Sequence, residues 1–532
     1  MFNVLFKYYF LILLLSFIFS QELITEPSRM LIINHEIKSI KNNRIDESLF
    51  VLPYINYSKT EKKYFNLVKN LNLGKKLIIE PVFSLRIYDN GNEILSKQNS
   101  LLWITPGIKM KSIIPIVTDY TSIWLNAWTS FYKHSAIFND YVFDSIEDRP
   151  LFQYNNHHSI GFFTKSIEPK KSIDFDQSQG GISLLSKNFE LYLGRFNTSF
   201  GPSTKSNLSL SVNAPPIDQL LFKFKNDKIV FSYMIGALDS NLPKEIPEDS
   251  IYTDKWIWKD NYQMLSNELL NTRSQEYNKY LAYHRIDIIP KENIRLGFYE
   301  QVIFGVRNIP IYYMIPVLPF WSSQHQSGDL DNLMIGFDFD YIFKKSNRIY
   351  FSLLIDEWAP YSTFKEDERN WFAYQVGFSK YFNLLTKDFL LKLEYTKIDP
   401  RVYNHRFIIN ESTHHSYNLG YWSGNHSDDL TFNLISQINS NSYIKLNYEF
   451  TRFGNNELFE EVSNLESQYN NQKIEFLGEE YNYRGLISLE FSTSIMNLFY
   501  LDIKLSEYNT KGLYFMDDFN DININLRYNI SK

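Results

Sequence analysis

The stretch ININLRYNIS, residues 522 to 531, alternates apolar and polar residues along its whole length. Its apolar residues, from Ile522 to Ile530, would share one face of a β-strand, whereas a helix would scatter them over both sides of its cylinder. The alternation therefore predicts a strand with one apolar and one polar face. Such a strand suits a water-soluble sheet and a membrane barrel equally, because the pattern does not show whether the apolar face meets a core or lipid.

The amino-terminal residues are typical of an export signal. Lys7 precedes an apolar run from Tyr8 to Phe19, and the small residue Ser20 follows it. The run is shorter than the roughly 20 apolar residues that a membrane-spanning helix needs, so we expect residues 1–20 to be a secretory signal peptide. No later stretch has the length and apolarity of a membrane helix, so the exported chain is either soluble or crosses a membrane as strands.

Composition narrows the choice further. The chain has 532 residues, a formal net charge of -6 and no cysteine. The negative charge argues against a nucleic-acid partner. Without cysteine, the exported chain cannot be a small domain stapled by disulfides. We find no linker and no repeat of fixed period, and a single large barrel accommodates this length in one unit.

Residues 21–74 differ from the rest of the chain and predict helices. Apolar residues recur at helical spacing between 30 and 40. Ser58 with Glu61 forms a capping-box pattern that opens a second helix, and Gly74 is a favourable end for it. We therefore expect residues 21–74 to form a small helical element on the periplasmic side.

From residue 75 onward the pattern has period two. The clearest strands are expected at residues 220–225, 335–343, 389–396, 444–451 and 501–506. Roughly 455 residues, at about 25 residues for a strand with its share of the connections, give about 18 strands in an even-numbered bacterial barrel. We predict an all-β fold: a transmembrane antiparallel β-barrel of about 18 strands at residues 75–532, with the small N-terminal periplasmic helical element.

Two segments depart from clean alternation. Residues 124–132 have apolar side chains mixed into both faces, as we expect where a strand packs against a plug or an inward-folded loop. The longest interruption runs from 239 to 279, and a loop of this length usually has a function or folds back into the barrel.

Several segments occur together in an order that marks a family. They are YLGRFNTSFGPS at 192–203, LSLSVNAPPIDQLLF at 208–222, YHRIDIIPKENIRLGFYEQVIFG at 283–305, PVLPFW at 316–321, DNLMIGFDFDY at 331–341 and LGYWSGNHSDDL at 419–430. Through these segments, between about 179 and 430, the chain resembles the Wzi family of outer-membrane capsule assembly proteins.

The resemblance implies a function as well as a fold. It implies an 18-stranded barrel with a small periplasmic helical bundle, largely occluded by its loops, which binds capsular polysaccharide or exopolysaccharide and helps to hold it at the surface of a Gram-negative cell. The implied partners are the polysaccharide and outer-membrane lipid, with the polysaccharide export machinery left open as a further partner. It carries no ligand-binding residue over to a numbered position.

Residues that could bind a metal ion or act in catalysis are explained more simply as parts of a barrel. His414 and His415 are adjacent, so on a strand they point to opposite faces and are poorly placed to share a metal ion. Asp338 and Asp340 share a face, which predicts a polar lumen wall rather than an acid–base pair. We therefore expect no catalytic residue, no metal and no cofactor.

Three further charged residues, Arg295, Glu300 and Arg307, are expected to line the lumen as well.

Polysaccharide binding requires flat aromatic rings that can pack on the apolar face of a sugar, with polar groups nearby for its hydroxyls. The candidates are Trp256 and Trp258 in the long loop, Trp321 before a polar run, and the adjacent Tyr421 and Trp422. The competing interpretation of all five is a ring at the membrane interface or one that packs a loop, because tryptophan is enriched at interfaces regardless of ligand.

Three functions remain open at this point. The leading hypothesis is a non-enzymatic barrel that binds polysaccharide for its assembly or attachment. The alternative is a porin or uptake channel, because the same polar-inward strands would line a pore. A second alternative is an outer-membrane hydrolase, which rests only on scattered His, Ser and Asp residues.

Overall fold

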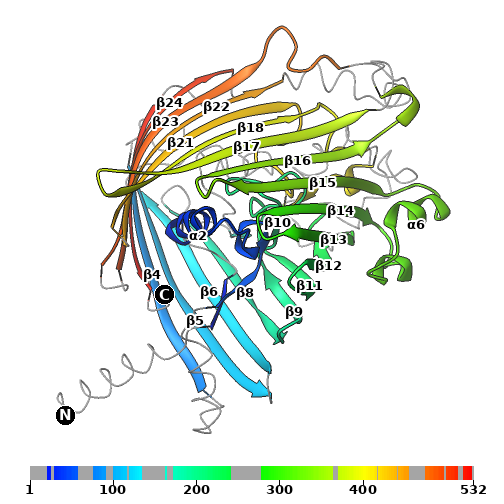
Figure 1. Ribbon diagram of the computed structural model, residues 1–532, viewed down its shortest axis with the longest axis horizontal. Coiled ribbons are helices and arrows are strands. Elements are labelled where there is room, and N and C mark those ends of the chain that lie inside the picture. Colours follow the sequence, from blue (N-terminus) through cyan, green and yellow to red (C-terminus); the bar gives the residue numbers. More distant parts are fainter. Residues whose placement is uncertain are drawn as a thin grey trace.

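The structure is a computed structural model of the 532-residue chain (Figure 1). It describes residues 21–24, 29–57, 76–90, 100–116, 119–134, 162–164, 172–240, 277–363, 370–405, 407–415, 417–439, 441–454, 474–495, 499–512 and 519–529. The expected signal peptide, the second predicted helix and most of the long loop at 239–279 lie outside the described residues.

Eighteen antiparallel strands close into one barrel, which confirms the predicted fold class. The strands are β4 (Lys76–Asn90), β5 (Ser100–Ile116), β6 (Asp119–His134), β8 (Ser172–Leu185), β9 (Phe189–Phe196), β11 (Ile217–Lys225), β12 (Ile229–Leu238), β13 (Lys279–Lys291), β14 (Ile294–Gly305), β15 (Asn332–Phe343), β16 (Asn347–Glu357), β17 (Trp371–Leu384), β18 (Lys387–Ile398), β21 (Ser427–Asn439), β22 (Ser442–Phe453), β23 (Asn482–Ile495), β24 (Phe499–Lys511) and β25 (Phe519–Asn529). A short strand, β7 (Phe162–Thr164), adds to the edge of β8. All five strands expected from the alternation, and the one at 522–531 as far as residue 529, fall within these elements.

The last described strand closes the barrel. β25 pairs with β4, with Leu526 opposite Leu85, so the stretch that first suggested a strand joins the end of the chain to the first barrel strand. Ile522 and Leu526 are exposed on the outer face, whereas Arg527 faces inward and forms an ion pair with Asp502. The two faces of the alternation are therefore divided between the exterior and the lumen, as the barrel prediction required.

The two ends of the barrel differ in their connections. Pairs such as β11–β12, β15–β16 and β17–β18 are joined by turns of a few residues, whereas long segments follow β12, β14, β18 and β22. We call these the short-turn end and the long-loop end. In bacterial outer-membrane barrels the short turns face the periplasm and the long loops face outward. Within the described part of the chain, no helix is long and apolar enough to cross a membrane.

The N-terminal segment, residues 29–57, lies inside the barrel at its short-turn end. Helix α2 (Arg29–Asn42) confirms the helix expected between residues 30 and 40. Its apolar stripe packs against inward-facing side chains of β18, β21 and β22, and the cluster comprises Ile33, Ile37, Ile40, Leu390, Ile435 and Tyr443. After α2 follow η1 (Glu47–Leu49), β2 (Val51–Leu52) and β3 (Tyr54–Tyr57), which pairs with β1 (Gln21–Ile24). That this segment faces the periplasm stays a prediction.

Two loops fold into the lumen above this segment. The inner loop, residues 197–216, contains β10 (Ser199–Phe200), which pairs with β2. The upper loop, residues 399–426, contains η5 (Ile408–Asn410) and the hairpin of β19 (Thr413–His414) and β20 (Tyr417–Asn418). The Ser211 amide donates to the Leu419 carbonyl over 2.7 Å, so the two loops bond to each other. The N-terminal segment, the inner loop and the upper loop together form what we call the plug.

A third loop packs on the outside of the barrel. The outer strap, residues 306–331, contains η3 (Ile311–Met314) and α6 (Phe320–Gln326), and it protrudes at the right of Figure 1. Its buried rings cover outward-facing side chains of β12, β13 and β14, in a cluster of Tyr233, Ala282, Val302, Phe304, Tyr313 and Phe320. A further short helix, η4 (Pro360–Ser362), follows β16.

The strap corrects two expectations about the lumen. Glu300 does not line the lumen: its side chain faces outward, where it accepts from the Phe320 amide of α6 over 2.7 Å and contacts His284. Arg307 lies in the strap itself, paired with Asp331. Only Arg295 of the three faces inward, because side chains alternate along β14 and residues 295 and 300 differ by an odd number of positions.

Replacing Ile522 with arginine should destabilise the barrel by about 2 kcal/mol, because residue 522 faces lipid near the middle of the β24–β25 hairpin. The matched change Asn523→Arg places the same charge on the inner face and should have a much smaller effect. Urea unfolding in detergent, followed by gel mobility of unheated samples, measures both. Equal destabilisation would contradict the assignment of faces.

Candidate functional site: the plugged lumen

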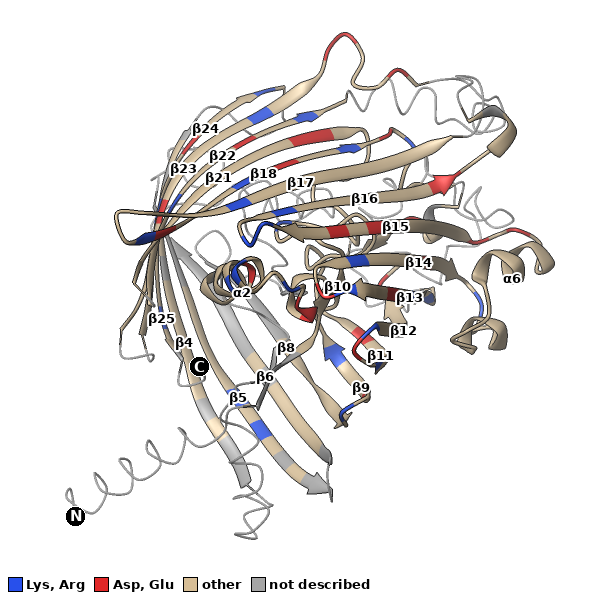
Figure 2. Cartoon of the chain, viewed as in Figure 1, with Lys and Arg blue, Asp and Glu red and all other residues tan. Residues whose placement is uncertain are grey.

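Charged side chains line the inner wall of β13 to β18. Arg285 pairs with Asp287 and Asp338 over 2.7 and 2.6 Å, and Arg295 shares Asp287 over 2.7 Å. Figure 2 shows acidic and basic residues on these strands and on α2, which lies beside them. Asp338 and Asp340 are both within this network, which confirms them as part of a polar wall.

Glu36 of α2 ties the helix to this wall. Its carboxylate accepts from Arg348 of β16 over 3.1 Å, from Lys392 of β18 over 2.8 Å and from the Ser379 hydroxyl of β17 over 2.8 Å. Burial by itself would raise the pKa of the Glu36 carboxyl, but Lys392 and Arg348 outweigh it and lower the pKa to about 2. One helical residue thus satisfies cations on two strands at once.

A second acidic residue of the N-terminal segment is held in the same way. Glu47 of η1 pairs with Lys223 over 2.6 Å and with Lys225 over 3.0 Å, both on β11. Lys223 also pairs with Glu190 of β9 over 2.6 Å, and Lys223 and Glu190 are fully buried. Burial opposes ionisation of Glu47, yet the two lysines lower its pKa to about 2. The N-terminal segment is therefore anchored to two separate parts of the wall.

The inner loop is anchored by a lysine. Lys205 pairs with Asp429 of β21 and, over 3.1 Å, with Glu449 of β22. Burial alone would lower the pKa of Lys205, but Asp429 and Glu449 outweigh it and raise the pKa. Ser203 of the same loop donates to Glu394 of β18 over 2.8 Å. These contacts hold the inner loop against the wall.

Tyr421 and Trp422 pack around the same carboxylate. The Tyr421 hydroxyl donates to Asp429 over 2.6 Å, and the Trp422 amide donates to the Ser206 hydroxyl over 3.0 Å. The Trp422 ring has the Arg484 guanidinium at 4.4 Å from its centroid and the Lys205 ammonium at 5.2 Å. A cation over an aromatic face is stabilising, most of all where water is excluded. Both rings are almost fully buried.

The inner wall of β24, β25 and β4 is more exposed than the inner wall of β13 to β18. Asp502 and Arg527 pair over 2.7 Å with about a quarter and a third of their side chains exposed, and the Arg527 guanidinium lies 5.7 Å from the Tyr500 ring. Ser84 of β4 donates to Asn525 of β25 over 2.8 Å. Carboxylate, guanidinium, amide and ring groups on one accessible surface are the groups that pair with sugar hydroxyls.

Of the three predicted aromatic site residues that the structure describes, it brings two together. Tyr421 and Trp422 lie side by side in the plug, whereas Trp321 is half-exposed on α6 outside the barrel. Trp256 and Trp258 lie outside the described residues. Whether any of the five contacts a ligand stays a prediction.

Sequence reasoning missed the residues that hold the plug. Glu36, Glu47 and Lys205 form ion pairs between the plug and the wall, but nothing in their local sequence sets them apart from solvent-facing charges. Trp124 is a partial exception, because its strand was expected to meet an inward-folded loop. Its side chain does face inward, where it packs edge-on against Phe196 with ring centroids 5.7 Å apart.

The described residues show no metal-binding arrangement. Among residues with described positions, no three His, Asp or Glu side chains are close enough together to hold an ion. His414 and His415 lie with ring centroids 4.3 Å apart, and the Nδ1 of His414 accepts from the Asp239 amide over 2.8 Å while His415 contacts the Asp239 carboxylate. The pair therefore helps to hold the upper loop beside the end of β12.

These features define a class of protein. The barrel has exposed apolar side chains on its exterior, charged side chains in its lumen and short turns at one end, which is the architecture of a bacterial outer-membrane β-barrel. The protein resides in the outer membrane. The model of the family described as capsule assembly protein Wzi matches residues 145–488, more than half of the chain, and the chain belongs to this family.

Solved structures share the architecture. The outer-membrane protein Wzi of Escherichia coli, described as a carbohydrate-binding β-barrel involved in group 1 capsule assembly, is 11% identical, with 95% of this chain and 98% of that chain covered and a TM-score of 0.54. OpdK of Pseudomonas aeruginosa, solved with vanillate, is 8% identical, with 85% and 98% covered and a TM-score of 0.47. OccAB4 of Acinetobacter baumannii is 10% identical, with 86% and 99% covered and a TM-score of 0.45. The first likeness shows the fold, and the scores of the other two are too low to argue from. No curated protein matches the chain.

Acid should weaken the anchoring of α2. Because the pKa of Glu36 is lower in the folded protein than its ordinary value of 4.5, its stabilising contribution is complete above pH 4.5 and disappears as the pH falls toward about 2. Glu36→Gln should cost about 3 kcal/mol near pH 7, since it leaves buried cations short of a partner. The unfolding free energy measured from pH 7 to pH 2 should therefore fall less in this variant than in the native protein.

A matched control for this measurement is Glu292→Gln. Glu292 is exposed in the turn between β13 and β14, so the same chemical change should leave the pH dependence close to that of the native protein. If both variants follow the native curve, Glu36 does not anchor the helix.

Reversing the charge of Lys205 should open the lumen. Lys205→Glu would place a third carboxylate beside Asp429 and Glu449, and the repulsion should drive the inner loop from the wall. Single-channel recordings in planar bilayers should show new conductance steps in this variant. Lys228→Glu, at an exposed turn between β11 and β12, is the control and should record like the native protein. Identical recordings from all three would show that this ion pair does not keep the lumen closed.

Proposed function

We propose that this chain binds capsular polysaccharide or exopolysaccharide and helps to assemble or attach it at the cell surface, without acting as an enzyme. The observation that carries the proposal is the family match over residues 145–488. The Escherichia coli structure that shares the fold is described as carbohydrate-binding, which supports the same function here. Outer-membrane lipid around the barrel and the polysaccharide export machinery complete the proposed partners.

The plug favours a binding protein over a channel. Within the described part of the chain, the inner and upper loops fold into the lumen and bond to each other, and α2 packs against β18, β21 and β22 at the short-turn end. Tyr403 of the upper loop donates its hydroxyl to the Leu208 carbonyl of the inner loop over 2.6 Å. A porin needs a continuous aqueous path, and these contacts obstruct one.

The aromatic residues are proposed to have different parts in binding. Trp321 offers an accessible ring at the long-loop end, where an extracellular polysaccharide arrives. Tyr421 and Trp422 are buried, so their contribution would be to hold the upper loop in place through Asp429 rather than to touch a sugar ring. Trp256 and Trp258 are proposed as further contacts of the long loop.

Deletion of the gene tests the proposal directly. Polysaccharide should then pass from the cell surface into the medium, and the native gene supplied on a plasmid should restore its retention. A complementary measurement is binding of the refolded barrel to the purified polysaccharide of the same cells. Unchanged retention in the deletion strain, together with no binding in solution, would overturn the proposal.

Replacing Trp321 with alanine should weaken polysaccharide binding by about 1 kcal/mol, the loss expected when one exposed stacking ring is removed. Trp358→Ala is the matched control, because Trp358 is a comparably exposed tryptophan in the connection after β16 that was not among the candidates. Isothermal titration with the purified polysaccharide compares the two variants. Equal affinities would remove Trp321 from the site.

A further inference from the structure

An ion pair faces outward on the barrel wall between β9 and β11. Arg195 donates from Nε and Nη2 to the two carboxylate oxygens of Asp218 over 2.7 and 2.6 Å. The neighbouring Gln219 faces the plug, where it accepts from the Thr198 hydroxyl of the inner loop over 2.8 Å, so Asp218 on the same strand must face the exterior. About half of each charged side chain is exposed.

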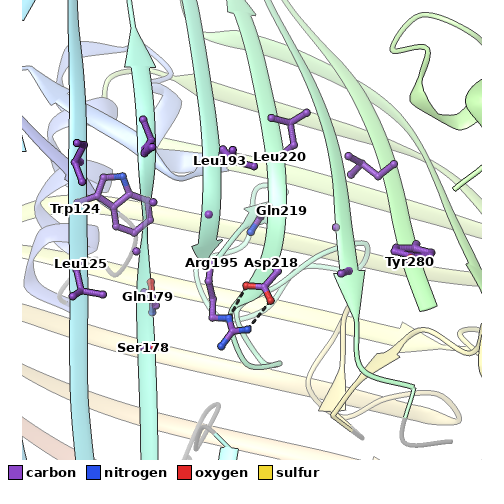
Figure 3. A pocket seen from close by; sticks show the side chains of 18 of the residues that line it. Trp124, Leu125, Ser178, Gln179, Leu193, Arg195, Asp218, Gln219, Leu220 and Tyr280 are labelled. Carbon is purple, nitrogen blue, oxygen red and sulfur yellow. Dashed lines mark hydrogen bonds and ion pairs between the residues drawn. The ribbon is translucent and has the colours of Figure 1, made fainter. Parts of the chain in front are cut away.

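The residues on either side of this pair are small. Gly180 of β8 lies opposite Arg195, and Ala237 of β12 lies opposite Asp218. Because neither neighbour carries a long side chain, the wall is hollowed around the pair. A groove with a volume of about 710 Å³ results, and Figure 3 shows Arg195 and Asp218 joined within it.

The groove continues over an apolar row. Five apolar residues are successive cross-strand partners on β6, β8, β9, β11 and β12, two residues nearer the short-turn end than the pair. They are Ile123, Ile182, Leu193, Leu220 and Ile235. All five line the groove. Ile123, Ile182 and Leu193 each have about half of their surface exposed, as expected for side chains that meet lipid.

The position of the pair along the strands sets its depth. Arg195 is the last but one residue of β9, and Asp218 is the second residue of β11, so both lie at the long-loop end of this part of the wall. A membrane strand of about 9 to 11 tilted residues spans the hydrocarbon core, and these two strands have eight and nine. The ion pair therefore lies where the outer leaflet changes from acyl chains to head groups.

The groove has raised sides. On one side β8 continues through residues 172–179, beyond the position opposite Arg195, with β6 paired alongside it. On the other side Ile309 of the outer strap and Tyr280 of β13 complete the lining. A molecule lying in the groove would be enclosed laterally while its head remained open to the outside.

We propose that this groove is a binding site for a glycolipid of the outer leaflet, with acyl chains along the apolar row and the sugar head on Arg195 and Asp218. Charged residues within a membrane wall are costly and mark functional positions, and about half of each side chain of this pair is left exposed. The His284–Glu300 pair offers the contrast, because Pro316 and Phe320 of the strap contact it directly.

The charge of the pair selects the kind of head group. One guanidinium and one carboxylate are neutral together, so the pair favours the hydroxyls of a glycolipid head over its phosphate groups. A sugar offers hydroxyls that both donate and accept hydrogen bonds, which suits a paired donor and acceptor group. The site is distinct from the polysaccharide contact proposed at Trp321, because Trp321 lies on α6 and is not among the residues that line the groove.

Native mass spectrometry of the detergent-purified full chain tests the site. The probes are lipopolysaccharide that lacks its O-polysaccharide and, separately, a mixture of phosphatidylethanolamine and phosphatidylglycerol. Arg195→Gln removes the ion pair, and Ala237→Trp fills the groove. Each should weaken lipopolysaccharide binding about tenfold, since a charge-assisted contact or the space for a chain is lost.

Two controls place the same changes elsewhere on the exterior. Arg452→Gln breaks the Arg452–Asp428 ion pair, which lies on the outer face of β21 and β22, and Leu446→Trp adds a ring to the exposed face of β22. Both should bind lipopolysaccharide as the native protein does. Purified polysaccharide binding, measured on all four variants, reports on their folding and separates this site from the polysaccharide contact proposed at Trp321.

Three results would overturn the proposal. One is equal lipopolysaccharide binding by the native protein and all four variants. The second is weakened binding in the controls as much as in Arg195→Gln and Ala237→Trp, which would indicate a general effect of the exterior. The third is phospholipid binding that is as strong as lipopolysaccharide binding and equally sensitive to the two groove variants, which would exclude recognition of the sugar head.

Discussion

The structure depends on one constraint. Charged side chains that are buried on the inner wall need partners of opposite charge. Arg348 is fully buried on the inner wall and Lys392 nearly so, and an unpaired cation there would cost several kcal/mol. Glu36 supplies the opposite charge from the N-terminal segment, and Lys205 does the reverse for Asp429 from the inner loop. The wall and the plug therefore require each other: neither set of charges is tolerable alone at these positions.

This mutual requirement has consequences for function. The inner loop is fixed by the ion pairs of Lys205 and bonds to the upper loop, so it serves as a scaffold on which the upper loop is held. Tyr421 and Trp422 join that scaffold through Asp429. The surfaces left for ligands are then the long-loop end, the polar wall near Asp502 and Arg527, and the lipid-facing exterior.

The pattern of residues predicted the strands because the two faces of each strand meet different surroundings, and neighbouring residues alternate between those faces. Residues 335–343 alternate because one side meets lipid and the other meets the plug, and the structure places them within β15. The same rule could have corrected the expectation for Glu300, since residues 295 and 300 lie on opposite faces of one strand. The position of Arg307 could not be predicted in this way. Arg307 lies after the end of β14 at Gly305, so the direction of its side chain depends on how the strap folds.

By itself the sequence determined the barrel, its approximate strand number, the first helix and the family resemblance. These follow from periodicity and from the order of short motifs, which are properties of neighbouring residues. Only the tertiary structure decided which loops enter the lumen, that Glu36 meets Arg348, and that Arg195 and Asp218 meet in an outward groove. Such contacts join residues far apart in the chain, and whether a charge faces solvent, a counter-charge or lipid is fixed only when the strands have closed.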